Sequence, residues 1–450
     1  MNSSNLLKLF EYVIQPVLEN HLMLNNRQFG FRGDTGCTSA LLILKEVIKK
    51  YVSENSSVFC AMIDVSKAFD KINYDVLKTK LMETSLPKHF VLIVDYMIRN
   101  TYVESFVNGL TSESWKMNNG TRQGGVNSPL IFSFYINQMI TSVSELGVGC
   151  TLGGVRSNII CYADDICCLA PTQVALQSIL DVVNEKLDEI KLHVNVKKCA
   201  VMLFGRNNAN HIPVLRLNSE VIDHVTQYKY LGVILSDNSA INTDIDRVMN
   251  SFLKQYNSMY RKFYDMNGEV LQFLFRTYTS SFYGIELWYD SLCNRYMNKL
   301  CICYHKAVKR VARLQVWDSN HLACDIVKVR TFPHLLAKRT ICLLFSIFKT
   351  RSPCLMPYKS YFVCNSSIVR ELKKYFSDKY GIENIVNNPL CAIISRIEYV
   401  RIQQTNIAML FAFAEGKFES FNKCVRLSLE EITGKGKFRI WLQKWKNNKF

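Results

Sequence analysis

Two short apolar runs on either side of an acidic pair are the feature that most constrains how this sequence can fold. Residues 158–163 (NIICYA) and 166–170 (ICCLA) flank Asp164 and Asp165. Both runs have the length of a strand, and turn residues between two such runs are typical of a β-hairpin. We therefore predict a hairpin that carries two carboxylates at its turn. Because burying an unpartnered carboxylate is costly, the pair requires a compensating cation or hydrogen-bond donor.

A third aspartate ends another apolar run. Residues 58–64 (VFCAMID) predict a buried strand with Asp64 at its exit. Three converging carboxylates repel one another, and a hard divalent cation such as Mg²⁺ or Mn²⁺ would relieve that repulsion. Two such ions can activate an attacking hydroxyl and stabilise the leaving oxygen in phosphoryl transfer. Taken alone, an Asp-Asp pair is more often an ordinary polar turn.

A glycine-rich loop lies between these aspartates in the sequence. Residues 119–129 read NGTRQGGVNSP, and glycines allow the backbone to approach a substrate closely. Ser128 as N-cap and Pro129 at the first helical position predict a helix that runs to about Leu146. The N-terminus of such a helix favours anions. A plain flexible loop is the alternative interpretation.

The remaining pattern is mixed α and β. We predict strands between residues 58 and 235 and mainly helices from 245 onward. Helices are predicted at 5–20, 37–51, 66–82 and 176–190, and further strands at 200–204 and 230–235.

Six motifs in a fixed order give the sequence a family resemblance. IDVSKAFD (63–70), GTRQGGVNSP (120–129) and CYADDICCLA (161–170) follow the order and spacing of reverse transcriptase motifs A, B and C. QFGFR (28–32) resembles the preceding fingers motif, NVKKC (195–199) motif D, and YLGV (230–233) the primer-grip motif E. The pattern is similar to the polymerase of LINE-type (non-long-terminal-repeat) retrotransposons over about residues 5–236.

The resemblance implies an RNA-directed DNA polymerase of right-hand architecture with an α/β (α+β) palm. Its parts would be partial fingers (1–57), the palm (58–236), a helical thumb (237–330) and a basic helical C-terminal region (331–450). An RNA template, a DNA primer or target and dNTPs are the implied partners. We expect no membrane association, because no apolar run approaches the roughly 18 residues of a membrane-spanning helix.

The resemblance also assigns roles to single residues. Asp64, Asp164 and Asp165 would be the catalytic residues and would bind two Mg²⁺ ions, with Mn²⁺ as the alternative, for attack of a primer 3′-hydroxyl on a dNTP. The implied dNTP-binding residues are Arg32 at the triphosphate, Val65 and Ser66 near the phosphates, Phe69 as a steric gate against the ribose 2′-hydroxyl, Gln123 and Gly124 at the nascent base pair, and Lys198 near the leaving pyrophosphate. The primer grip would be Tyr230, Leu231 and Gly232.

Some of these assignments have open alternatives. Phe69 could pack in the core, and Lys197 could take the place of Lys198. Asp70 closes motif A without being a metal ligand in the family, and could be a charge on a helix surface. A bulky gate at Phe69 disfavours an RNA-templated RNA polymerase.

The beginning of the chain bears on the kind of element. It has no signal-peptide layout, so we expect an intracellular protein that acts in the nucleus or in a cytoplasmic ribonucleoprotein. The upstream fingers segment and the endonuclease of LINE-type elements do not precede QFGFR, so we expect a truncated element. A catalytically inactive remnant that only binds nucleic acid, and an intron-maturase-like reverse transcriptase, are the alternatives.

Positive charge is concentrated in the last third of the chain. The net charge of the whole chain is +17, which favours nucleic acid as a partner. Residues 291–450 hold 28 lysines and arginines against 10 acidic residues, while 1–290 hold 27 against 28. Possible phosphate or base contacts there are Lys306, Lys309, Arg310 and Arg313 at helical spacing, and Trp441, Lys444, Trp445 and Lys446.

The 16 cysteines include no Cys-x-x-Cys pair, and many have apolar neighbours. We therefore predict buried, reduced thiols rather than a disulfide scaffold. Cys301, Cys303 and His305 lack the spacing of a zinc site, so we interpret them as structural.

Overall fold

The computed structural model describes residues 5–122, 124–205, 214–238, 241–279, 281–288 and 294–365. These residues form two compact units. Within the described ranges, the first unit comprises residues up to 231 together with 237–238 and 351–358. The second comprises 232–236, 241–350 and 359–365. None of the described helices is both long enough and apolar enough to cross a membrane.

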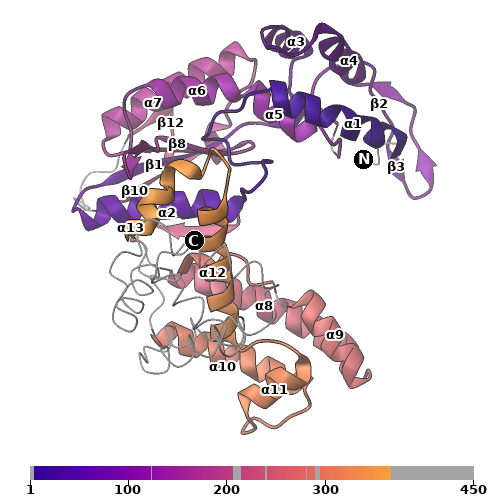
Figure 1. The fold of residues 1–450 in the computed structure, drawn as a ribbon, viewed down its shortest axis with the longest axis vertical. Helices are drawn as coiled ribbons and strands as arrows, with labels where there is room; N and C mark the ends of the chain where they lie inside the picture. The colour runs from indigo at the N-terminus through magenta and orange to yellow at the C-terminus, as the bar shows by residue number, and fades with distance from the viewer. Residues whose placement is uncertain are drawn as a thin grey trace, which may run out of the picture. The chain divides into compact units, whose positions relative to one another are not determined.

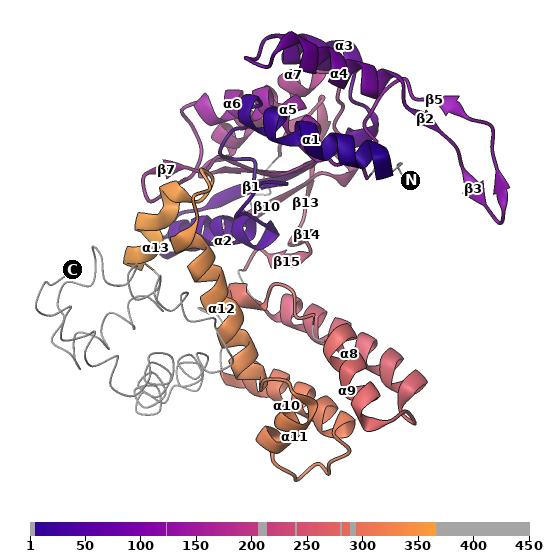
Figure 2. The ribbon, with the colours of Figure 1, turned by 45° about the vertical axis from the view of Figure 1, so that its right-hand side comes forward.

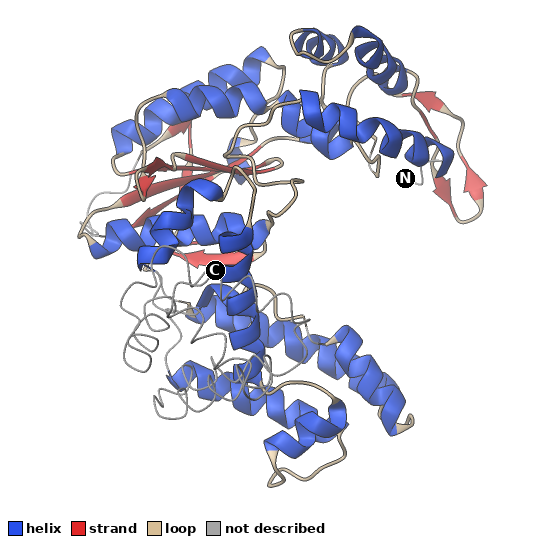
Figure 3. Cartoon of the chain, in the orientation of Figure 1, coloured by secondary structure: helices blue, strands red, loops and turns tan. Residues whose placement is uncertain are grey.

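The first unit contains helices on either side of a sheet (Figure 3). Its α-helices are α1 (Asn5–His21), α2 (Cys37–Ser53), α3 (Tyr74–Met82), α4 (Lys88–Arg99), α5 (Ser128–Tyr135), α6 (Asn137–Glu145) and α7 (Gln173–Glu189). Its 3₁₀ turns are η1 (Ala68–Asp70), η2 (Val196–Lys198) and η4 (Met356–Tyr358). Its longer strands are β1 (Val58–Asp64), β8 (Ile159–Tyr162), β9 (Asp165–Ala170), β10 (Ala200–Phe204) and β14 (Gln227–Tyr230).

Short two-residue strands complete the first unit. They are β2 (Tyr102–Val103), β3 (Phe106–Val107), β4 (Leu110–Thr111), β5 (Trp115–Lys116), β6 (Thr151–Leu152), β7 (Val155–Arg156), β11 (Arg216–Leu217), β12 (Glu220–Val221) and β13 (Asp223–His224).

A five-stranded sheet in the order β13-β10-β1-β9-β8 forms the centre of this unit (Figure 1). β1 pairs antiparallel with both β10 and β9, and β9 continues antiparallel to β8. β13 adds to β10 in parallel. The strands predicted at 58–64 and 200–204 and the hairpin over 158–170 are thereby confirmed.

Helices cover both faces of this sheet (Figure 2): α6 and α7 lie on one face and α2 on the other. Ala61 and Ile63 of β1 belong to the same core as Leu176 and Val183 of α7. Alternate residues of a strand point to opposite faces, so Cys60 and Met62 point toward α2. Because both faces are covered, β1 is apolar along its length rather than alternating with polar residues.

The helix predicted over 66–82 is wrong in its first half. The chain forms η1, passes through a loop, and starts α3 only at Tyr74, where the Asn73 side chain accepts from the N–H groups of the first turn. The carbonyls of Phe69 and Ile72 accept from Thr121 (2.8 Å) and Gly120 (2.9 Å) in the glycine-rich loop. These tertiary bonds take acceptors that a continuous helix would have used.

The helix predicted from Ser128 to about Leu146 is two helices, α5 and α6, which meet at Ile136. Asn137 opens α6, and its side chain binds the main chain of Asn25 and Met23. The predicted N-cap is also wrong: Ser128 is already helical, and its hydroxyl donates to the Arg122 carbonyl (2.7 Å).

The strand predicted at 230–235 is likewise interrupted. β14 ends at Tyr230 and β15 (Val233–Ser236) begins the second unit. The break falls at Leu231 and Gly232, whose φ values are +44° and +80°. Leucine rarely adopts a positive φ, so a turn here is hard to predict from sequence.

The second unit is helical after β15, as predicted from residue 245 onward. It contains α8 (Asn242–Phe263), α9 (Gly268–Tyr278), η3 (Ile285–Trp288), α10 (Asn294–Val311), α11 (Asn320–Val327), α12 (Phe332–Lys349) and α13 (Lys359–Asn365). Its core is rich in aromatic rings, and Phe252, Phe275, Phe282, Tyr304 and Phe332 contact one another there.

The buried carboxylate of Asp244 links several elements of this unit. Asp244 is only 2% exposed, and its oxygens accept from the Arg247 guanidinium (2.6 Å), the Trp288 indole N–H (2.9 Å) and the Ile234 main-chain N–H (3.0 Å). Without the carboxylate, the Trp288 and Ile234 N–H groups would lose this acceptor, and Arg247 would keep only its bond to the Tyr283 carbonyl (3.2 Å).

We expect Asp244→Ala to lower the free energy of unfolding by about 3 kcal/mol, because it removes the charge that partners the half-buried Arg247 guanidinium and leaves the Trp288 and Ile234 N–H groups without their acceptor. Urea unfolding measures the loss. Asp246→Ala on the same helix is the matched control: its exposed carboxylate binds Lys299 (3.0 Å), and the change should cost about 1 kcal/mol or less. Equal losses in the two variants would contradict the role of Asp244.

Candidate active site

The three predicted catalytic aspartates lie at one end of the sheet. Asp64 is the last residue of β1 and pairs in register with Asp165, the first residue of β9. Asp164 precedes Asp165 in the hairpin turn, where Ala163 has a φ of +57°. The structure thus brings together three carboxylates that are separated by 100 residues in sequence, with Asp165 in a strand rather than in the turn.

Two of these carboxylates, Asp164 and Asp165, have a raised pKa. Partial removal from water raises the pKa of Asp165 to about 6, and repulsion from Asp164 and Asp64 adds to the effect. Burial, and then repulsion from Asp64, also raises the pKa of Asp164, against a hydrogen bond from its own backbone. The site is therefore short of positive charge.

The donor set fits a hard divalent cation. Carboxylate oxygens are the ligands that Mg²⁺ and Mn²⁺ prefer, and a cation would remove the repulsion that raises the two pKa values. The three carboxylate groups do not converge on one point. Among the described residues, no group of three or more His, Cys, Asp or Glu side chains is placed to hold a metal ion. The residues fit such an ion in chemistry and in backbone position.

The segment that follows α7 forms hydrogen bonds with the backbone of Asp64. Asn195 donates its main-chain N–H to the Asp64 carbonyl (2.9 Å), and Asp64 donates its own N–H to the Cys199 thiol (3.4 Å). Burial raises the pKa of that thiol to about 11, so it stays protonated. The Lys198 ammonium lies 3.8 Å from an Asp64 oxygen, which places a cation beside the aspartates.

Val65 and Ser66 follow Asp64 directly. The Val65 side chain is buried and its backbone bridges to Val194, so only its main chain faces the end of the sheet. Ser66 is half-buried, and its N–H donates to the His193 carbonyl (3.0 Å).

Phe69 has one face in the core and one face open. It is half-buried, and its ring stacks on Phe132 at a centroid distance of 4.3 Å. Core packing and a gate role are therefore compatible for this residue. Asp70 is exposed at the end of η1, as expected for a surface charge.

The glycine-rich loop joins the site through its backbone. Gly120 has a φ of +88°, and a Cβ atom there would lie 2.8 Å from the Asp70 backbone, so only glycine fits. Gly124 also has a positive φ, +90°. Gln123 lies outside the described residues.

The hairpin turn rests on a residue that sequence reasoning missed. Gln28 is fully buried, and its Oε1 accepts from the N–H groups of Ala163 and Gly30 (both 3.0 Å). Phe29 and Arg27 exchange main-chain bonds with Cys161. A Cβ atom at Gly30 would lie 2.6 Å from the Ala163 nitrogen. QFGFR therefore holds the turn that carries Asp164. The presence of this motif in the sequence is the signal from which the role of Gln28 could have been found.

Cys354 and Tyr358, which lie far along the chain, bind residues within QFGFR or next to it. The Cys354 thiol donates to the Gln28 carbonyl (3.2 Å), and the Tyr358 hydroxyl binds Arg27 (3.2 Å) and Ser157 (2.8 Å). The Arg32 guanidinium binds the Asn25 carbonyl (2.9 Å) and the Cys354 sulfur (3.4 Å). Its assignment to the dNTP triphosphate stays a prediction.

Tyr230 lies beneath the hairpin. Its side chain is buried, and its hydroxyl donates to the carbonyls of Ile160 and Asp165 (both 3.3 Å). Burial raises its pKa well above the usual range. The ring thus supports the catalytic hairpin from the motif assigned to the primer grip, while Leu231 and Gly232 form the half-buried turn that follows it.

The basic residues predicted at helical spacing do not all lie on α10, because Arg313 follows its last residue, Val311, with a φ of +58°. Most of these residues bind groups within their own unit. Lys309 donates to the Val316 carbonyl (2.6 Å), Arg313 to the Met266 carbonyl (2.8 Å), and Arg310 lies over the Tyr260 ring at 4.8 Å. Trp441, Lys444, Trp445 and Lys446 lie outside the described residues, as does most of 331–450.

Cysteines behave as predicted where the structure describes them. Those with described side chains are free thiols, most of them buried. Cys301 and Cys303 lie on α10 and share no metal site with His305. His305 is buried and accepts the Phe332 main-chain N–H at 3.4 Å, so its role is structural.

The fold and this arrangement of aspartates define a template-directed polymerase of the palm type. The family model "Reverse transcriptase (RNA-dependent DNA polymerase)" matches residues 2–235, and the chain belongs to this family. Its members use divalent metal ions. The α/β polymerase fold predicted from the motifs is thereby confirmed.

The chain is similar to retrotransposon proteins. It is 26% identical over 249 residues to a "Retrovirus-related Pol polyprotein from type-1 retrotransposable element R2" of Nasonia vitripennis, which covers 53% of this chain and 24% of that protein. It is 25% identical over 301 residues to an "RNA-directed DNA polymerase from mobile element jockey" of Drosophila melanogaster, with coverages of 63% and 32%. The chain thus spans about a quarter to a third of these relatives, and the resemblance to non-long-terminal-repeat elements is confirmed.

Among solved structures, the apo telomerase of Candida tropicalis matches with a TM-score of 0.41 and 11% identity. The match covers 84% of this chain and 60% of that one.

The structural role of His305 predicts a pH effect on stability. Burial, then the neighbouring charges of Lys309 and His321, lower its pKa to about 4, against a bond with the Cys301 backbone. Since the folded pKa lies below the ordinary value of about 6.5, protonation favours unfolding. The contribution of the neutral ring is complete above about pH 6.5 and is lost as the pH falls toward 4.

We expect the difference in unfolding free energy between wild type and His305→Gln to shrink by about 2–3 kcal/mol from pH 7 to pH 4. Urea unfolding at several pH values measures it. A difference that stays constant over this range would show that the ring is not held neutral by burial.

Proposed function

We propose that this chain carries the polymerase core of a non-long-terminal-repeat retrotransposon reverse transcriptase, which extends a primer 3′-hydroxyl with dNTPs on an RNA template. The observation that supports it most is the register pair of Asp64 and Asp165, with Asp164 next to it in the turn. Three carboxylates with mutual repulsion at an open sheet end are suited to metal-dependent nucleotidyl transfer.

Asp64, Asp164 and Asp165 would hold two Mg²⁺ ions, with Mn²⁺ as the alternative. When bound, such ions activate an attacking hydroxyl and stabilise the charge on the leaving oxygen. The protein's own contribution is to fix the carboxylates: the strand register sets Asp64 and Asp165, and Gln28 and Tyr230 hold the hairpin between and below them. Holding the backbones of these residues in place limits the reorganisation that the site would need when the ions bind.

The remaining assigned residues surround these aspartates in ways that suit a dNTP. Lys198 places a positive charge 3.8 Å from Asp64, where it can attract a phosphate. Gly124 and the backbone beside Gly120 offer close approach without side chains. The open face of the Phe69 ring provides steric bulk near motif A, which a ribose 2′-hydroxyl would meet.

The partners follow from the same proposal. An RNA template and a DNA primer or target would be the polymer substrates, since the relatives of similar sequence are named as RNA-directed DNA polymerases and Pol polyproteins of mobile elements. The place of action would be the nucleus or a cytoplasmic ribonucleoprotein.

We expect the purified chain to extend a DNA primer on an RNA template with Mg²⁺, and Asp165→Asn and Asp164→Asn each to reduce the rate by at least about 100-fold, because each removes a charged ligand. Asp181→Asn, at an exposed carboxylate on α7, is the matched control and should retain the wild-type rate.

A wild-type chain that extends nothing with Mg²⁺ or Mn²⁺ would contradict the proposal. RNA or DNA binding without extension would then favour the inactive remnant that only binds nucleic acid.

We expect Phe69→Ala to lower the selectivity for dNTP over NTP by about 10-fold or more, because removing the ring opens space for a 2′-hydroxyl. Single-nucleotide incorporation with each substrate measures it. Phe132→Leu is the matched control, since it disturbs the same stack without changing the ring that faces the site. If both variants changed selectivity equally, or neither did, Phe69 would be a packing residue rather than a gate.

A further inference from the structure

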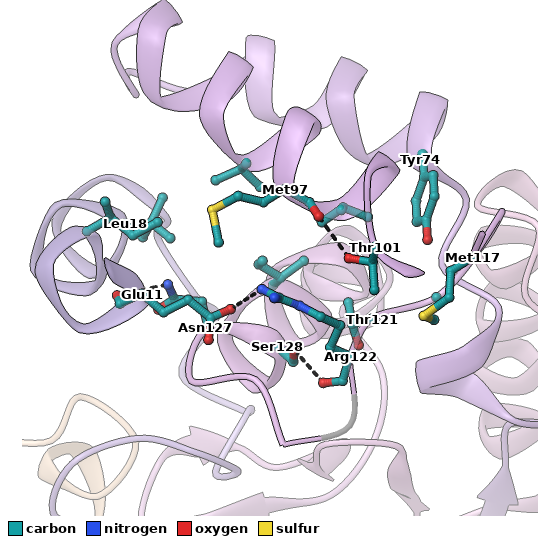
Figure 4. Close-up of a pocket in the computed structure, with 15 residues that line it drawn as sticks. Glu11, Leu18, Tyr74, Met97, Thr101, Met117, Thr121, Arg122, Asn127 and Ser128 are labelled. Carbon is teal, nitrogen blue, oxygen red and sulfur yellow. Dashed lines mark hydrogen bonds and ion pairs between the residues drawn. The ribbon is translucent and has the colours of Figure 1, made fainter. Parts of the chain in front are cut away.

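Glu11 is a buried charge that no motif of the sequence explains. It lies on α1, is only 2% exposed, and faces the glycine-rich loop rather than solvent (Figure 4). Burying a carboxylate costs several kcal/mol unless hydrogen bonds and an opposite charge compensate it. Its contacts therefore show what the charge is there to hold.

The hydrogen bonds that Glu11 makes with distant residues join it to the loop. Oε1 accepts from the Arg122 guanidinium (2.5 Å), and Oε2 accepts from the Val126 main-chain N–H (2.8 Å). The Glu11 carbonyl accepts from the Asn127 amide (3.0 Å). One residue of α1 thus binds the loop on both sides of Gly124.

The two ends of this loop segment are also hydrogen-bonded to each other. Ser128 donates its hydroxyl to the Arg122 carbonyl (2.7 Å), which joins the two ends of the segment. Gly125 lies inside this closure: a Cβ atom there would lie 2.6 Å from the Ser128 hydroxyl and 3.3 Å from a Glu11 carboxylate oxygen. The Glu11 carboxylate and the loop therefore fit with no space for a larger residue at 125.

The surroundings make this ion pair strong. It lines a cavity whose other walls are mainly apolar, including Ile14, Leu18, Val94, Met97 and Ile131 (Figure 4). Arg122 is itself only 15% exposed on its side chain. In such a setting, water competes weakly for the charges, and the attraction between them is stronger than it would be at the surface.

We propose that Glu11 is a positioning residue for dNTP selection, which holds the glycine-rich loop in the shape that meets the nascent base pair. The inference rests on the proposed function, because it takes Gly124 and Gln123 to line that base pair. Glu11 touches no substrate itself and acts through Arg122 and the Val126 N–H. Its loss should weaken dNTP binding and base selection more than the rate of the chemical step.

A role in stability alone would not need this residue. A buried ion pair can often be replaced by apolar residues at little cost in stability, whereas a carboxylate that binds one side chain and one main-chain N–H specifies where a loop lies. The two explanations separate in kinetics: uniform weakening of substrate binding raises KM, while loss of folded protein lowers the apparent rate with every substrate.

The test compares Glu11→Gln with Glu19→Gln in the full chain. Gln keeps the size of the side chain, but it removes the charge that binds Arg122 and replaces the carboxylate acceptor of the Val126 N–H with the weaker oxygen of a neutral amide. Glu19 is an exposed carboxylate on the same helix, which makes it the matched control. Steady-state primer extension gives KM and kcat for the correct dNTP and for a mismatched one, at a temperature where melting curves show all variants folded.

We expect Glu11→Gln to raise the KM for the correct dNTP about 10-fold, with kcat within about 3-fold of wild type, and to reduce discrimination against the mismatch. Glu19→Gln should match wild type in all three quantities. Arg122→Gln should raise KM similarly, and the double variant should be no worse than either single one, because both act through one contact.

Two results would overturn the proposal. One is a Glu11→Gln enzyme with the kinetic constants of Glu19→Gln. The other is a parallel loss of kcat and melting temperature without a change in KM or mismatch discrimination, which would leave Glu11 a stabilising residue only.

Hydrogen exchange separates this proposal from the proposed function. The Val126 amide should exchange faster in Glu11→Gln than in Glu19→Gln, whether or not the chain polymerises. If the wild-type chain were inactive but showed this difference in exchange, the proposed function would be wrong and Glu11 would still hold the loop. Equal exchange in the two variants would show that Glu11 does not hold the loop.

Discussion

Repulsion among three carboxylates at the end of one sheet is the constraint on which the rest of the first unit depends. Strand pairing places Asp64 opposite Asp165, and burial together with repulsion among the carboxylates raises the pKa values of Asp164 and Asp165. A fold can keep such charges together only if their backbones are held firmly. β1 sits at the centre of the sheet with both faces covered, which is where a strand is least able to move.

The supports come from distant parts of the chain and use buried polar groups rather than additional apolar packing. Gln28 binds the turn, Tyr230 binds the strand ends, and Glu11 binds the glycine-rich loop. Each is almost completely removed from water, where an unmade hydrogen bond is expensive and a made one has a defined direction. Apolar contacts would hold these segments near one another, but they would not set the orientation of a turn or a loop. The polar supports provide that orientation.

Much of this arrangement could be predicted from the sequence, and the parts that could not share a cause. The strand ending at Asp64 and the hairpin at Asp164 follow from apolar run length, and the family motifs placed both in one site. The helix predicted from Ser66 failed because the carbonyls of Phe69 and Ile72 bind a loop some fifty residues away. The turn at Leu231 has no glycine or asparagine at its first position to signal a positive φ. Glu11 looks like a solvent-facing charge on an amphipathic helix until its partners are known. In each case the deciding interaction was tertiary.

Residues 351–358 return to the first unit after residues 241–350 of the second unit. All six motifs lie before residue 237, yet Cys354 and Tyr358 are fully buried against the segment that supports the catalytic turn. The polymerase core is therefore discontinuous along the chain, and its boundary cannot be drawn at the last motif. During synthesis on the ribosome, the aspartates would be made long before the residues that complete their surroundings. Assembly of the site would then wait until residues 351–358 have been made, after most of the described second unit.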